Sequence, residues 1–123
     1  MKTMKYLVAG LLLAGLSVPA MAQTSQADID AITKVIVDAK GDAIATKDQV
    51  KAFKKTYKKD ATAIAALGRA FLEAKNYQMA EEIANLAIKA NGKSAEGYIL
   101  LGDIASAQDD GGKAAGYYEQ GTY

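Results

Sequence analysis

Apolar residues recur at intervals of three and four along most of this chain, which is the period of a helix that buries one face. Ile29, Ile32 and Ile36 show this pattern first, in a segment that ends before Gly41. No segment alternates apolar and polar residues with the period of two that a half-buried strand requires. The pattern therefore predicts an all-α fold. The expected helices cover residues 26–40, a segment from Lys47, residues 61–75, 77–90 and 95–107, and a segment from Lys113 to the end.

Polar and glycine residues mark where these helices begin and end. Thr46 with Gln49 three residues later has the form of a capping box, which predicts that the second helix begins near Lys47. Asp60 and Ser94 can cap the helices that follow them, because their side-chain oxygens accept from the first free N–H groups. Breaks between helices are expected at Gly41, Asn76, Asn91–Gly92 and residues 109–112.

The first 22 residues have the features of a secretory signal peptide. Lys2 and Lys5 precede an uncharged apolar run over residues 6–18, and residues 20–22 (Ala-Met-Ala) form a cleavage site. The alternative is an uncleaved anchor, but the run of 13 residues is shorter than the roughly 20 of a spanning helix. We expect cleavage after Ala22, no membrane span thereafter, and a periplasmic or secreted protein. Without cysteine the chain is not expected to be a lipoprotein.

Charge is balanced over the mature chain and uneven along it. Removing Lys2 and Lys5 from the 15 basic residues leaves 13, beside 14 acidic residues, which does not favour nucleic-acid binding. The C-terminal segment from Glu96 holds five acids and one lysine, Lys113. A run of lysines is either a solvated helix face or a basic patch for an acidic partner or membrane surface. Its members are Lys47, Lys51, Lys54, Lys55, Lys58 and Lys59.

Two stretches of the chain repeat each other with a spacing of 34 residues. The pair Leu67-Gly68 is followed 34 positions later by Leu101-Gly102. This is the period of the tetratricopeptide repeat, and residues 61–94 and 95–123 resemble two copies of it. The positions that match are Ile64, Leu67, Gly68, Phe71, Ala80 and Ala87 in the first copy and Tyr98, Leu101, Gly102, Ala114 and Tyr118 in the second. The sequence departs from the family pattern at Ala84, Gly92, Ala105 and Gly121.

The resemblance implies antiparallel helix pairs stacked as a short right-handed solenoid of the tetratricopeptide type. Glycine or alanine at the matched positions would let helices approach closely, and the bulky residues would fill the space beside them. Residues 23–60 would form a degenerate first pair, because Thr33-Lys34 stands where Leu-Gly is expected. The alternative is an ordinary helical bundle in which the 34-residue spacing of similar residues arises by chance.

The last predicted helix carries three tyrosines without a polar capping helix after it. These residues, Tyr117, Tyr118 and Tyr123, could cover themselves or contact a partner. The third interpretation, which we favour, is that the sequence is the N-terminal part of a longer repeat protein.

Side chains for catalysis are scarce. The chain has no histidine and no cysteine, so the usual ligands and nucleophiles of zinc, haem and Ser–His–Asp or Cys–His sites are missing. Asp28 and Asp30 are expected to favour the N-terminus of the first helix through its dipole. Carboxylate pairs drawn from Glu73, Glu96 and Asp103 would occur on any helical surface. We therefore expect neither an enzyme nor a cofactor.

The function that the resemblance implies is binding of a protein or peptide. In the family, the first helix of each pair lines a concave groove, to which Thr62, Ala65 and Ala107 would contribute. Arg69 could pair with a carboxylate of the partner, or else with Glu73 or Asp103 of this chain. The expected partner-binding residues are Arg69, Leu72, Glu73, Ile99, Asp103 and Ser106. The alternative function is a structural or oligomerisation element that docks, or self-associates, through the C-terminal helix.

Overall fold

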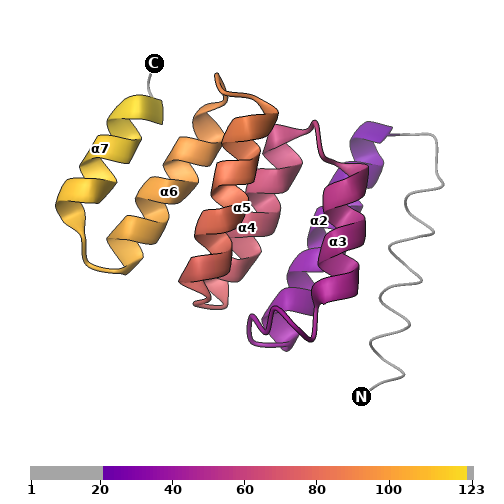
Figure 1. Cartoon of the computed structure of the whole chain (residues 1–123). Helices are drawn as coiled ribbons and strands as arrows, with labels where there is room; N and C mark the ends of the chain where they lie inside the picture. The colour runs from indigo at the N-terminus through magenta and orange to yellow at the C-terminus, as the bar shows by residue number, and fades with distance from the viewer. Residues whose placement is uncertain (1–20, 122–123) are drawn as a thin grey trace.

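The computed structural model describes the backbone of residues 21–121 and the side chains of residues 26–121. Within the described residues the chain forms six α-helices and no strand, which confirms the all-α prediction (Figure 1). All but the last two residues of the predicted signal peptide, and also Tyr123, lie outside them. No helix in this part of the chain has the length and apolar character of a membrane span. The helices are α2 (Met21–Asp38), α3 (Lys47–Thr56), α4 (Ala61–Glu73), α5 (Tyr77–Ala90), α6 (Ala95–Ala107) and α7 (Gly111–Gly121).

The helices pack as successive pairs. Helix α4 packs against α5, α6 packs against α7, and α2 packs against α3. Helix α4 also contacts both α2 and α6, so the first helices of the three pairs lie in one row. In Figure 1, α3 and α5 lie in front of α2 and α4. Helices α3 and α5 therefore flank this row on the same side, and α7 lies beside α6 at its end.

The turn inside each pair has the same hydrogen-bonding pattern. A backbone N–H of Gly41, Asn76 or Asp110 donates, over 2.9 Å in each turn, to the carbonyl five residues earlier. The residue before each donor has a positive φ, of 56°, 67° and 62° respectively. This is the turn by which many helices satisfy their last carbonyls. A capping side chain follows each turn, from Asp42, Asn76 and Asp110, and these three are spaced by 34 residues.

Helix α3 begins at Lys47 with Thr46 at its N-cap position, as predicted, but the capping box itself is wrong. The Thr46 side chain makes no capping hydrogen bond, and its hydroxyl donates to the Asp42 carbonyl over 2.9 Å instead. Asp42, four residues before Thr46, caps the turn that precedes α3, because its Oδ1 accepts from the N–H groups of Ile44 and Ala45. Gln49 is buried, and its Oε1 has no hydrogen-bond partner within the described residues. The caps expected at Asp60 and Ser94 are confirmed.

Two further expectations about helix ends need correction. Gly111 and Gly112 belong to the first turn of α7, not to the preceding turn, because Asp110 caps the helix directly before them. Asp28 does not lie at a helix start, since α2 begins two turns earlier. Its carboxylate is buried and accepts from the Tyr57 hydroxyl over 2.5 Å, which ties α2 to the end of α3.

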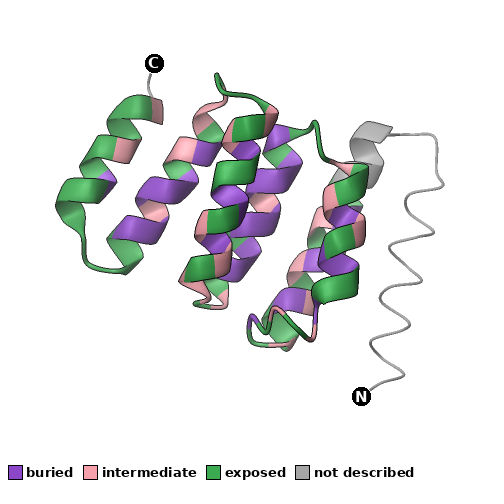
Figure 2. Ribbon diagram, in the orientation of Figure 1, coloured by how far each residue is buried: buried purple, intermediate pink, exposed green. Residues whose placement is uncertain are grey.

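The core runs through all three pairs (Figure 2). Besides large apolar side chains, the core contains fully buried alanines of α5. Because alanine is small, these residues let α5 pack close to α4. Most of the residues assigned to repeat packing are buried, but Tyr98 and Tyr118 are partly exposed. The largest fully buried apolar residues are Phe53, Phe71, Ile32, Ile36, Leu67, Ile83, Leu100 and Ile104.

Gly68 and Gly102 are two positions where neighbouring elements approach the backbone closely. A Cβ atom at Gly68 would lie 2.7 Å from Leu100 Cδ2 and 3.2 Å from Ile83 Cγ2, which are fully buried side chains. A Cβ atom at Gly102 would collide with the ring of Tyr118. The leucine of the third pair can therefore sit against α4 because position 68 carries no side chain.

Replacing Gly68 with Val should lower the free energy of unfolding by about 2 kcal/mol, because the added carbons overpack a buried contact. In thermal unfolding this corresponds to a fall in Tm of about 10 °C. The matched control is Gly116→Val in α7, where a Cβ atom would meet nothing within 4 Å. The control should be neutral or slightly stabilising, since valine favours a helix over glycine. Equal effects at both glycines would contradict the packing described here.

Candidate partner-binding face

Four polar side chains join α4 to α6 in two cross-helix contacts. The Thr62 hydroxyl donates to Glu96 Oε1 over 2.5 Å, and Arg69 Nη1 donates to Asp103 Oδ2 over 2.7 Å. Both contacts link residues 34 positions apart, so equivalent positions of the two helices stand side by side. We call the surface that bears these contacts the α4–α6 face.

Asp103 is the centre of a three-residue network. Its Oδ2 accepts from Arg69, and its Oδ1 accepts from the Tyr118 hydroxyl over 2.6 Å. Of the two residues of this chain considered as partners for Arg69, Glu73 and Asp103, the structure shows Asp103. The side chains of Arg69 and Asp103 are 49% and 31% exposed, so water screens the pair and its net stabilisation is at most about 1 kcal/mol. The network orients the guanidinium more than it stabilises the fold.

The hydrogen bond to Asp103 raises the pKa of Tyr118 above its ordinary value of 10.0, and desolvation and the negative charge of Asp103 act in the same direction. Arg69 opposes this effect, because its positive charge favours the phenolate. The neutral phenol is therefore the form that the folded protein prefers. The stability that this preference contributes is present below about pH 10 and is lost as the pH rises through the raised pKa.

Two apolar residues at equivalent positions, Ala65 and Ile99, lie along the helices between the two cross-helix contacts. Ala65 is buried, whereas Ile99, 34 positions later on α6, is 38% exposed. At this point the α4–α6 face therefore exposes one branched apolar side chain, that of Ile99, near the charged groups of Glu96 and Arg69. Such an arrangement can hold an apolar side chain of a partner and hydrogen-bond to its neighbours.

The remaining predicted site residues extend this face towards the C-terminal ends of the two helices. Leu72 is half-buried and packs against the core, so little of it is open to a partner. Glu73 and Ser106 are exposed in the last turns of α4 and α6. The structure thus brings Arg69 and Asp103 into contact, while the other predicted residues share the helices without a common network.

Sequence reasoning assigned Tyr118 to repeat packing and missed its second role. Its ring covers Gly102, and its hydroxyl reaches across from α7 to Asp103. The one local signal was the absence of a side chain at Gly102, which leaves room for a ring. The choice of Asp103 as its partner depends on how α7 folds back against α6.

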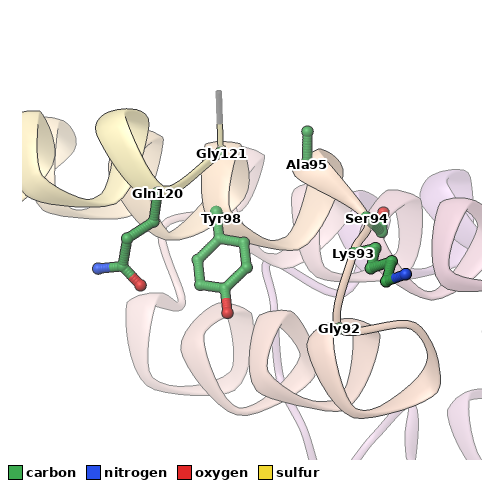
Figure 3. A pocket seen from close by; sticks show the side chains of 7 residues that line it. All are labelled: Gly92, Lys93, Ser94, Ala95, Tyr98, Gln120 and Gly121. Atoms are coloured by element: carbon green, nitrogen blue, oxygen red, sulfur yellow. The ribbon is translucent and has the colours of Figure 1, made fainter. Parts of the chain in front are cut away.

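A separate small hollow lies where the α5–α6 loop meets the end of α7 (Figure 3). Its volume is about 250 Å³, and Tyr98 lies between Gln120 and the loop residues Lys93 and Ser94. Ser94 already caps α6 by accepting from Glu96 N over 3.3 Å. The hollow contains none of the predicted partner-binding residues.

The described residues contain no group of three or more aspartate, glutamate, histidine or cysteine side chains placed to hold a metal ion. The groups on the α4–α6 face are a carboxylate-bound guanidinium, a phenol, a second carboxylate and an isoleucine. Their chemistry is that of hydrogen bonding, ion pairing and apolar contact.

The sequence was compared with protein-family models and with curated proteins, and no match was found in either comparison.

Asp103→Asn should lower the pKa of Tyr118 towards its ordinary value of 10.0, because a neutral amide stabilises the protonated phenol less than a carboxylate does. An NMR titration of the Tyr118 ring measures this directly. Asp109→Asn is the matched control, since Asp109 is exposed and its positive φ suits asparagine. An ordinary pKa for Tyr118 in the unmodified protein would rule out the network.

Proposed function

We propose that this chain is an exported repeat protein of the tetratricopeptide type and that its α4–α6 face binds a segment of another protein. The observation that carries the proposal is the pair of cross-helix contacts between residues 34 positions apart. The three capping residues with the same spacing support it, because they extend the period to the degenerate first pair. Both observations are expected of a stack of equivalent helix pairs.

The mode of binding follows from which groups on the face are already engaged. Both carboxylate oxygens of Asp103 accept from groups of this chain, so Asp103 positions Arg69 rather than the partner. Arg69 has five N–H donors in a fixed fork and remains half exposed. A carboxylate or backbone carbonyl of the partner is the natural acceptor for those donors. Ile99 would contact an apolar side chain of the same segment.

The location of the protein is also part of the proposal. It rests on the charged, apolar and small-residue portions of residues 1–22, which would direct export and cleavage after Ala22. Protein recovered from the periplasm or medium should then begin at Gln23. An N-terminus at Met1 on the exported protein would contradict cleavage.

A second candidate function, docking through α7, rests on the exposure of that helix. Among the described residues of α7, Ala114 is buried and Tyr118 is 37% exposed. A further helical element or a second copy of the chain could pack on the open side of α7. Repeat arrays commonly cover their last helix in this way.

The double substitution Arg69→Glu with Ile99→Asp should abolish capture of the partner from an envelope extract, because it removes both the donor and the apolar contact. Circular dichroism should report unchanged helicity, since both side chains are substantially exposed. Partner capture is measured by quantitative mass spectrometry against protein that lacks the substitutions.

The matched control combines Lys47→Glu with Val37→Asp, because neither residue lies on the α4–α6 face or on α7, Val37 and Ile99 are 37% and 38% exposed, and the charge change is the same. Ala115→Arg tests docking through α7, since Ala115 is exposed on that helix. Tyr118 is unsuitable for this purpose because it contacts Asp103. Retention of all partners by the first variant and their loss on Ala115→Arg would reject the α4–α6 face in favour of α7.

A further inference from the structure

A basic groove lies between α3 and α5, and Ile64 is the one described residue lining it that belongs to α4. Its volume is about 460 Å³. Of the described helices, α3 packs closely against α2 alone, so it does not close onto α5 and the space between them stays open. We call this space the lysine groove. It is lined by Lys51, Lys54, Lys55, Lys58, Ile64, Leu86, Lys89 and Ala90.

The lysines of the groove stand on both of its walls. Those of α3 follow helical spacing, because Lys51 is followed one turn later by Lys54 and Lys55 on the same face, and Lys58 lies in the turn directly after the helix. Lys89 stands on the wall formed by α5. Between the walls, Leu86 is 38% exposed, beside the small side chain of Ala90. The groove therefore combines a cationic rim with an apolar floor.

No acidic residue lines the groove to balance these charges. Within residues 26–121, the ion pairs join Lys34 to Asp38 and Arg69 to Asp103, and none involves a lysine of the groove. Like charges held on facing walls repel one another, and a bound anion relieves that repulsion. The groove is thus complementary in charge to an acidic ligand.

We propose that the lysine groove binds an acidic segment of a partner protein, with carboxylates paired to the lysines and an apolar side chain on Leu86. A free phosphate would engage two or three lysines and leave Leu86 uncovered. Proteins that bind a bilayer surface insert protruding apolar side chains into it, whereas here the apolar side chain, Leu86, lies in a groove between two helices. A chain segment with one apolar side and flanking carboxylates matches both the rim and the floor.

This second interaction is independent of the function proposed above, because the two surfaces share no residue. The charged groups of the lysine groove come from α3, the turn after it and α5, whereas those of the α4–α6 face come from α4 and α6. Variants of one surface leave the other unchanged. Loss of binding at either one is therefore distinguishable from loss at the other.

The test measures binding of a synthetic helical peptide with glutamates on both sides of a leucine, by fluorescence anisotropy, to protein purified after expression of the whole chain. The triple substitution Lys51→Gln, Lys58→Gln and Lys89→Gln should raise the Kd at least about tenfold, since it removes charge from both walls. Leu86→Ser should weaken binding of the leucine-containing peptide. The Kd of a peptide with serine in place of leucine should be the same for the Leu86→Ser variant and the unmodified protein.

The matched control is the triple Lys47→Gln, Lys59→Gln and Lys93→Gln, which removes equal charge outside the groove. It should change the Kd by no more than about twofold, because exposed lysines that do not line the groove form no direct pair with the peptide and act on it only through screening salt solution. Equal loss in both triples would overturn the proposal in favour of unspecific charge attraction. If Leu86→Ser left the Kd of the peptide unchanged, the groove would bind anions without an apolar contact, which overturns the proposal. Inorganic pyrophosphate should then compete with the peptide for the groove.

Two other occupants give different results. Vesicles with about one quarter anionic phosphatidylglycerol would bind the unmodified protein, and not the groove triple, if a lipid surface were the ligand. The peptide would then show no groove-dependent binding, which overturns the proposal. Self-association that disappears in the groove triple, measured by analytical ultracentrifugation, would assign the groove to a second copy and would overturn it too.

Discussion

Neighbouring helix pairs stack in this protein because the backbone at Gly68 is free of a side chain. Leu100 of the third pair and Ile83 of α5 both occupy space that a Cβ atom would need. These side chains are fully buried, so they have no room to move aside. The same reasoning applies at Gly102, which the ring of Tyr118 covers. The register of one pair against the next is thus set by packing against a backbone position that carries no side chain.

The candidate site is a consequence of that register. Once Leu100 sits against Gly68, residues 34 positions apart on α4 and α6 stand side by side, and Thr62 reaches Glu96 while Arg69 reaches Asp103. Polar contacts this exposed add little to stability, but they hold the Arg69 guanidinium in place beside Asp103. The first pair is placed differently, because α3 stays away from α5 and leaves a groove lined with lysines.

Helical periodicity and capping residues were sufficient to predict all six described helices and the caps at Asp60 and Ser94. The spacing of Thr46 to Gln49 placed the start of α3 correctly, but the predicted capping box does not form, because the Thr46 hydroxyl donates to Asp42 in the turn that precedes the helix. The bond from Tyr57 to Asp28 joins residues 29 positions apart, and no local pattern encodes it. The link from Tyr118 to Asp103 and the groove beside α3 likewise depend on how whole helices pack.

Cross-linking tests the register most directly, because the chain has no cysteine of its own. A short bifunctional thiol reagent should join the two thiols efficiently when Thr62→Cys is combined with Glu96→Cys, since these side chains are in contact. Thr62→Cys combined with Asp103→Cys moves the second thiol about 10 Å along α6 and should give little product. Equal yields from the two pairs, or a higher yield from the second, would contradict the account.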